Sequence, residues 1–410
     1  MRFLRELPLF TLLLSLLLTL SAGAQTGMTL SENARVSLLT IYPGNELYST
    51  FGHSAIRIVD PAYKLDRIYN YGTFSFEEPG FYIKFCRGKL DYQLAAYSFS
   101  WAEAEYTQDQ RPIIEQKLRL TPAMRQAVFQ FLEWNYLPDN RRYRYDFFFD
   151  NCATRIRDVF EHTLGDSLAL YYNDSRQMTF RDYIDLYLVN LPFSDYGIDL
   201  GLGAKTDRLA TAREALFLPD YLYEAFGGAT ITIGGETLPL VSAIDTLLWF
   251  EGRQTPPARD TLPWADIVLW GVLGVSAVVT LRNRSSRDST LLNRWLDYPL
   301  FGLTGLVGWL IVFLWFFTDH TSTPNNWNIL WAWPTHLFIF LAPSLLKRYP
   351  GGRIYFAVCA GVMLLTLLGW PLWPQRFNTA TIPLVLTLMV RSAWMAWGKR
   401  RRAKGEGRRA

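Results

Sequence analysis

The sequence contains few of the side chains that build metal sites. Its 410 residues include only three cysteines and four histidines. Cys86, Cys152 and Cys359 do not follow a metal-ligand spacing, which argues against a zinc site. The chain also shows no glycine-rich loop that would cradle a phosphate. We therefore expect an activity that uses neither a metal nor another cofactor.

Net charge is also small. The formal net charge is +4, and the basic residues cluster beside apolar segments, in Arg282–Arg287 and Lys399–Arg409. Positive residues in such positions typically orient a chain across a membrane. The charge therefore gives no reason to expect a nucleic-acid partner.

Long apolar segments, by contrast, are abundant, and the first lies at the N-terminus. Residues 1–24 predict a signal peptide, with Arg2 and Arg5 ahead of the apolar core Leu7–Leu20. The small residues Ala22-Gly23-Ala24 form a cleavage pattern. An uncleaved anchor is the alternative, but the apolar core is short for a membrane span, which favours cleavage.

Five further apolar segments have the length of membrane-spanning helices. They are residues 264–281, 298–318, 327–346, 353–374 and 379–397. The loops after the first, third and fifth segments are basic, whereas the other two loops together hold one arginine. Because positive residues prefer the cytoplasm, the region before the first span is expected outside it. This orientation agrees with the predicted export signal.

These segments divide the chain. We predict an extracytoplasmic domain at 25–255, a proline-rich linker at 256–263, a membrane domain at 264–398 and a basic cytoplasmic tail at 399–410.

Within residues 25–255, strand patterns precede helix patterns. Alternating apolar residues predict strands at 34–41, 51–59, 67–76 and 90–97. Helix caps are expected at Thr121, at Thr179 and at Asp150 or Asn151, and a hairpin is expected at 230–240. The stretch 195–207, with three glycines, is typical of a mobile loop. The order predicts an α+β domain with an antiparallel sheet, followed by an all-α membrane domain of five transmembrane helices.

Cys152 and His53 are the candidate catalytic pair. Only a thiolate attacks, and the start of a helix favours a negative sulfur at Cys152. An imidazole can take the thiol proton, and backbone N–H groups at the helix start can hold an oxyanion. His162 is a rival base, but it lies ten residues further along the same helix, about 15 Å away. A structural role for both residues, including a Cys86–Cys152 disulfide, is the alternative.

The phrases around these two residues resemble the permuted branch of the NlpC/P60 cysteine superfamily, which includes lecithin–retinol acyltransferase. In that branch the histidine strand precedes the cysteine helix, and an Asn-Cys pair opens that helix. The whole chain, from signal to last span, resembles the Lnb-type lipoprotein N-acyltransferases. The matching stretches are Phe51–Ile58, Tyr69–Phe76, Asp150–Asp158 and Asn325–His336.

The resemblance implies an acyltransferase in the bacterial inner membrane, with its catalytic domain in the periplasm and its C-terminus in the cytoplasm. Cys152 would take an acyl chain from a phospholipid as a thioester. The chain would then pass to the N-terminal amine of a diacylglyceryl-cysteine lipoprotein, with His53 as the base. The implied partners are the phospholipid donor, the diacylated lipoprotein and the membrane.

The superfamily also uses a third polar residue that orients the histidine. Asn70 is our candidate, with Tyr71 and Thr73 as competitors. Arg155, Asn151 and Tyr71 are candidates for substrate binding.

Two other functions stay open. One is a cell-wall peptidase or amidase of the NlpC/P60 type, and the other is a non-enzymatic membrane assembly protein. The polar residues between the second and third spans could contact lipid headgroups or be ordinary loop residues; they are Asp319, His320, Asn325, Asn326 and Asn328.

Overall fold

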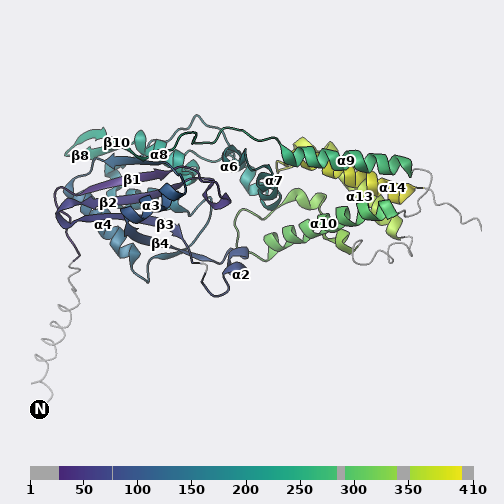
Figure 1. Ribbon diagram of the computed structural model, residues 1–410, viewed down its shortest axis with the longest axis horizontal. Helices are drawn as coiled ribbons and strands as arrows, with labels where there is room; N and C mark the ends of the chain where they lie inside the picture. The colour runs from purple at the N-terminus through teal and green to yellow at the C-terminus, as the bar shows by residue number, and fades with distance from the viewer. Residues whose placement is uncertain (1–26, 76, 284–290, 339–350, 399–410) are drawn as a thin grey trace, which may run out of the picture.

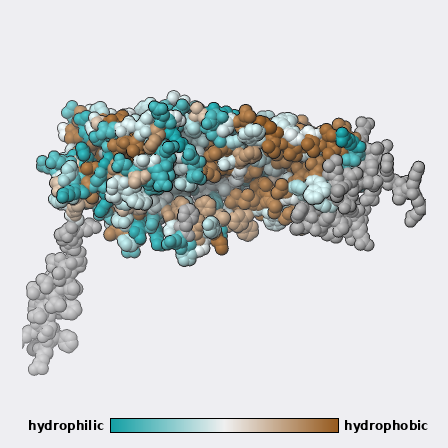
Figure 2. Space-filling model, in the orientation of Figure 1, coloured by the Kyte–Doolittle hydropathy of each residue, from teal (hydrophilic) through white to brown (hydrophobic). Residues whose placement is uncertain are grey.

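The computed structural model describes residues 27–75, 77–283, 291–338 and 351–398. The predicted signal peptide and the C-terminal tail lie outside the described residues. Figure 1 shows an elongated molecule with a mixed domain at one end and a helical domain at the other. Hydrophobic residues dominate the visible surface of the helical end, whereas the mixed end is largely hydrophilic (Figure 2). This division matches the predicted α+β domain followed by a membrane domain.

The mixed domain is built on a seven-stranded antiparallel sheet with the order β10-β5-β1-β2-β3-β4-β6. The strands are β1 (Arg35–Ile41), β2 (His53–Asp60), β3 (Leu65–Thr73), β4 (Asp91–Ser98), β5 (Ile113–Leu118), β6 (Arg142–Arg144) and β10 (Val241–Leu248). The four predicted strands are present within a few residues. A second, small sheet contains β7 (Leu168–Ala169), β8 (Thr230–Ile233) and β9 (Glu236–Pro239), and includes the predicted hairpin.

Helices cover both faces of the large sheet. The helices of this domain are α2 (Phe81–Cys86), α3 (Phe99–Gln108), α4 (Pro122–Tyr136), α5 (Cys152–Leu164), α6 (Phe180–Leu188), α7 (Pro192–Gly201) and α8 (Pro219–Gly227). Successive strand residues point to opposite faces, so Leu38 packs in one core with α4 and α5, and Leu39 in another with α3. Thr121, Asn151 and Thr179 cap their helices as predicted.

Short 3-10 helices connect many of these elements. They are η1 (Leu47–Ser49), η2 (Pro61–Tyr63), η3 (Gly165–Ser167), η4 (Ala204–Asp207), η5 (Glu214–Phe217), η6 (Trp327–Leu330), η7 (Pro334–His336) and η8 (Trp370–Leu372). The prediction of a mobile loop at 195–207 is wrong, because α7 and η4 occupy most of this stretch. The buried guanidinium of Arg181 pairs with Asp199 and, at 2.8 Å, with Asp207, which fastens this segment to α6.

The helical domain contains α9 (Trp264–Arg282), α10 (Leu291–Phe316), α13 (Gly351–Leu368) and α14 (Thr381–Trp397). By length and composition, α9 and α10 can cross a membrane, and α13 and α14 are shorter apolar helices. The third predicted span begins differently from our prediction, because 327–336 forms η6 and η7 rather than one helix. This segment packs closely on α10, where a Cβ on Gly308 would lie 2.2 Å from the Ala332 carbonyl oxygen.

Hydrogen bonds join the two domains. The amide of Gly203 donates to Ser322 O at 2.9 Å, and a Cβ at Gly203 would lie 1.9 Å from Pro324 O. The side chain of Asn326 donates to Leu200 O at 2.7 Å, and that of Gln375 donates to Leu202 O at 2.9 Å. Asn326, one of the outer polar residues whose role was open, therefore contacts the mixed domain.

A buried ion pair joins three helices of the helical domain. Arg391 of α14 donates to both carboxylate oxygens of Asp297 on α10, at 2.7 and 2.8 Å. It also donates to Thr280 Oγ1 on α9 at 2.8 Å. Both charged side chains are almost inaccessible, so removal of one partner would leave the other charge buried alone.

We therefore expect Arg391→Leu to lower the free energy of unfolding by about 3–5 kcal/mol, because Asp297 loses its only charged partner among the described residues. Thermal unfolding in detergent measures the effect. Arg282→Leu, at the exposed end of α9, is the matched control and should change little. Asp297→Leu combined with Arg391→Leu should recover much of the loss; an equally unstable double variant would contradict this explanation.

Candidate active site

The start of α5 is fixed by the side chain of Asn151. Its Oδ1 accepts the amides of Ala153 and Thr154, each at 3.0 Å. Its Nδ2 donates to the carbonyl oxygens of Phe147 at 2.8 Å and Phe217 at 2.7 Å. Asn151 is buried and these bonds use both ends of its amide. It therefore positions Cys152, the first residue of the helix, and its expected role in substrate binding stays a prediction.

His53 is the first residue of β2, and its ring is held by the neighbouring strand. Nε2 of His53 lies 2.6 Å from Oδ1 of Asn70 on β3. Nδ2 of Asn70 donates to the hydroxyl of Tyr97 on β4 at 2.7 Å. This amide orientation makes Nε2 the protonated nitrogen, so Nδ1 is the one that can accept a proton. The same Cys-His-Asn residue set serves catalysis in papain-like proteases.

Cys152 lies beside the backbone of this histidine strand. Backbone N–H groups of Ser54, Ala153 and Cys152 itself lie close enough to the sulfur to favour its ionised form and so lower the pKa of the thiol. A β-bulge after Asn70 brings Gly72 against the start of α5. A Cβ on Gly72 would lie 3.8 Å from Cys152 Cβ, and its φ of +89° also favours glycine. The sheet thus places the thiol next to the residue that follows His53.

The resting pair is electrically neutral. Burial raises the pKa of the Cys152 thiol above its ordinary value, and the three N–H donors and Arg111 only partly oppose this. Burial, with the positive charge of Arg111, lowers the pKa of His53 to about 4, although the bond to Asn70 opposes that shift. Both residues keep part of their surface exposed.

Arg111 is a residue that the sequence reasoning missed. Its guanidinium is buried, donates through Nε to Tyr42 O at 2.9 Å, and leaves Nη2 without a partner among the described residues. It precedes β5, a strand that the apolar pattern did not predict. No local motif marks this arginine, so only the fold reveals that it lies near the dyad.

The remaining candidates are used within the protein. Arg155 forms an ion pair with Asp150 and lies 4.1 Å above the ring of Tyr143. The hydroxyl of Tyr71 donates to Asn135 Oδ1 at 2.5 Å in the core. The hydroxyl of Tyr71 is therefore already bonded within the protein, and its expected role in substrate binding stays a prediction. The expectation for Arg155 stays a prediction.

The rival roles of the other cysteines and histidines find no support in the geometry. All three cysteines fall in described residues and all are free, so no Cys86–Cys152 disulfide is present. The ring of His162 lies against Phe131, 5.1 Å between centroids. His336 of the helical domain bonds the hydroxyl of Tyr355 through Nδ1 at 2.7 Å.

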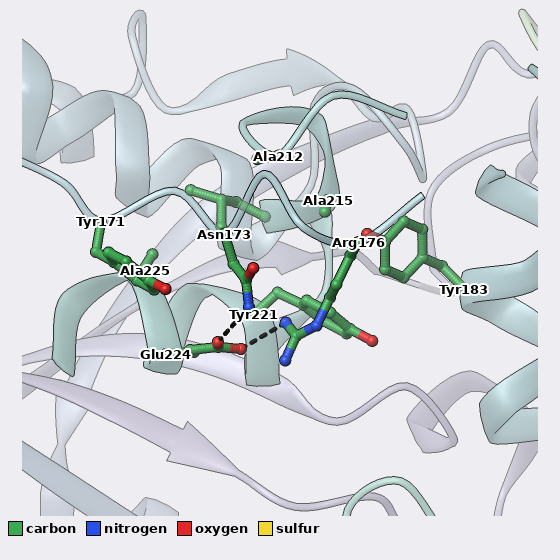
Figure 3. A pocket seen from close by; sticks show the side chains of 10 residues that line it. Tyr171, Asn173, Arg176, Tyr183, Ala212, Ala215, Tyr221, Glu224 and Ala225 are labelled. Carbon is green, nitrogen blue, oxygen red and sulfur yellow. Dashed lines mark hydrogen bonds and ion pairs between the residues drawn. The ribbon is translucent and has the colours of Figure 1, made fainter. Parts of the chain in front are cut away.

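Neither described cavity contains the dyad. The one in Figure 3 holds about 10 Å³, room for about one water. Its Arg176 and Glu224 pair with each other at 2.5 Å. A larger cavity of about 510 Å³ lies between α6, α7 and the helical domain. It adjoins a carboxylate cluster whose members bond Arg376, Arg181 and Asn378; they are Asp185, Asp195 and Asp199.

Comparison with known families identifies both domains. The family model of the Lnb N-terminal periplasmic domain matches residues 25–185. The model of the Lnb transmembrane domain matches residues 263–402. Neither a curated protein nor a solved structure gave a significant match. The two matches cover most of the chain, and they place the domain that contains Cys152 and His53 in the periplasm.

The neutral resting pair predicts how Cys152 responds to pH. In Cys86→Ser, Cys359→Ala protein, the rate of Cys152 alkylation should rise with a midpoint above 9.0, because burial disfavours the thiolate. In denaturant the midpoint should fall towards the ordinary thiol value, so at pH 8 the unfolded chain reacts faster. Alkylation rates by mass spectrometry measure both. A rate that stays constant down to acidic pH would instead show a thiolate–imidazolium pair.

Proposed function

Because this chain belongs to the Lnb family of membrane proteins with a periplasmic domain, we propose that it is a lipoprotein N-acyltransferase of the bacterial inner membrane. The acyl donor is a membrane phospholipid, and the acceptor is the N-terminal amine of a diacylglyceryl-cysteine lipoprotein. The observation that carries the proposal is the thiol of Cys152, which lies at a capped helix start beside the strand of His53 and Asn70.

The first half-reaction loads the enzyme. Nδ1 of His53 takes the thiol proton as the sulfur of Cys152 attacks the ester carbonyl carbon of the phospholipid. Backbone N–H groups at the start of α5 and from Ser54 are available to hold the oxyanion. The C–O ester bond then breaks, and His53 returns the proton to the leaving alcohol. The products are a Cys152 thioester and a lysophospholipid.

The second half-reaction transfers the acyl chain from Cys152 to the lipoprotein. The α-amine of the lipoprotein attacks the thioester carbonyl, and its lost proton passes to His53. The C–S bond breaks, the thiol recovers the proton, and an amide remains on the lipoprotein. A thioester suits these two half-reactions because it reacts with amines, and a site that limits water protects it from hydrolysis.

The turn that leads to Cys152 contacts the helical domain, and this contact favours a lipid substrate over cell-wall peptide. Thr321, in the loop that follows α10, donates to Asp146 Oδ2 at 2.5 Å. Asp146 in turn accepts the amides of Phe148 and Phe149, at 3.0 and 3.1 Å, in the turn that leads to Cys152. The nucleophile is thus tied to the outer end of a helix that can span the membrane.

The acyl-enzyme gives the most direct test. Incubated with phospholipid and no acceptor, the purified protein should gain the mass of one acyl chain, and hydroxylamine should remove it. Cys152→Ala should gain nothing, whereas Cys86→Ala, which removes an exposed thiol, should behave like wild type. Intact-protein mass spectrometry measures the change. Absence of loading in folded wild-type protein would overturn the proposed function.

Asn70 should act by positioning His53. Asn70→Ala is expected to slow acyl loading by about ten- to a hundredfold, because the imidazole loses the partner that fixes its tautomer. Asn70→Asp keeps an oxygen opposite Nε2 and should retain more of the rate. Tyr97→Phe removes only the outer hydroxyl of the chain and should have the smallest effect. Equal rates for the alanine and aspartate variants would rule out this positioning role.

A further inference from the structure

The short helix α2 presents large apolar side chains to its surroundings. Tyr82 is 75% exposed, Ile83 67% and Phe85 51%. The helix connects β3 to β4 and anchors itself through Phe81, which is buried. Soluble surfaces seldom gather three such residues on a single helical turn, and exposed apolar clusters of this kind mark interaction sites.

The position of α2 indicates what covers these side chains. The amide of Asp319 donates to Arg87 O at 2.9 Å, and Nε2 of His320 lies 3.2 Å from Cys86 O. Both partners belong to the loop that directly follows α10, and Figure 1 shows α2 next to that end of α10. The apolar side chains of α2 therefore lie near the end of α10, whose exposed apolar residues include Leu303, Leu306, Leu310 and Phe316.

A row of aromatic rings leads from α2 towards the thiol. Phe81 stacks on Phe74 with 5.7 Å between centroids, and Phe74 meets Tyr92 at 5.2 Å. Tyr92 stacks on Tyr145 at 4.2 Å. A Cβ on Gly72 would lie within 3.9 Å of both the Tyr145 ring and Cys152 Cβ. The row thus joins the buried side of α2 to the nucleophile.

We propose that α2 inserts into the periplasmic leaflet of the membrane and, with the aromatic row behind it, guides an acyl chain from that leaflet to Cys152. The occupant of the α2 face is membrane lipid. Helices of this type lie in the interface with apolar side chains among the acyl chains and cationic residues at the headgroups. Exposed Arg87, at the end of the helix, supplies such a cation, and Tyr82 is of the type enriched at this depth. Only the guiding role rests on the proposed acyltransferase function.

Insertion can be measured without any activity. The full chain with Cys86→Ser, Cys152→Ser and Cys359→Ala is spin-labelled at Ile83→Cys and reconstituted in vesicles of phosphatidylethanolamine and phosphatidylglycerol. A label in lipid collides more with oxygen than with a water-soluble nickel complex. Tyr63→Cys, at the 57% exposed Tyr63 of η2, provides the matched aqueous control. The same collision ratio at both positions would overturn the insertion of α2.

The guiding role is tested by comparing two acyl donors. Tyr82→Ser, Ile83→Ser and Phe85→Ser together should lower loading of Cys152 from vesicle phospholipid about tenfold or more, because apolar contact with the leaflet is lost. Loading from monomeric dihexanoylphosphatidylcholine should be unchanged. The control combines Tyr63→Ser, Leu137→Ser and Ile244→Ser, which replace exposed residues elsewhere in the domain. It should load normally from both donors.

The outcomes separate the two proposals. An equal loss with both donors, or no loss with either, would overturn the guiding role of α2. If wild-type protein loads from neither donor, the acyltransferase function fails, while the spin-label ratio still decides whether α2 lies in the membrane.

Discussion

The amide of Asn151 is the interaction on which the site depends. It joins the first turn of α5 to the carbonyl oxygens of Phe147 and Phe217, which come from separate parts of the chain. The backbone N–H of Asn151 also donates to Thr154 Oγ1 at 2.8 Å. Together these bonds give the start of the helix a single register. Cys152 consequently lies beside the start of β2. The thiol lies near N–H groups of both the helix α5 and the strand β2. The bonds of Asn151 to Phe147 and Phe217 hold α5 where this is possible.

Attachment to the helical domain adds a second constraint. The loop after α10 contacts Asp146, in the turn that leads to Cys152, through Thr321. It contacts the end of α2 through Asp319, and Gly203 of the mixed domain lies against the far end of the same loop. One short loop therefore touches the nucleophile's support, the apolar helix and the interdomain contact. This arrangement fixes the position of Cys152 relative to the helical domain, and the proposed bilayer substrate would require such a fixed position.

The sequence predicted the parts that local signals encode. Caps such as Thr121 have a side-chain mechanism that a short phrase reveals, and the strand of His53 shows clear alternation. Prediction from the sequence failed where the residues that bury a side chain come from distant parts of the chain. Strand β5 carries Glu115 and Gln116 as buried polar residues, so its pattern does not alternate. Arg111 and the docked α7 segment depend on partners far along the chain, which periodicity cannot register.

The neutral dyad gives the proposed chemistry its order of events. A thiolate formed in advance would require the Cys152 thiol to ionise against its raised pKa, and an imidazolium would require His53 to gain charge against its lowered one. Proton transfer is therefore expected to accompany attack, when the oxyanion can receive the N–H donors. The positive charge of Arg111 disfavours a protonated imidazole and favours a negative sulfur. Its buried guanidinium therefore favours nucleophilic attack by the sulfur over a resting thiolate–imidazolium ion pair.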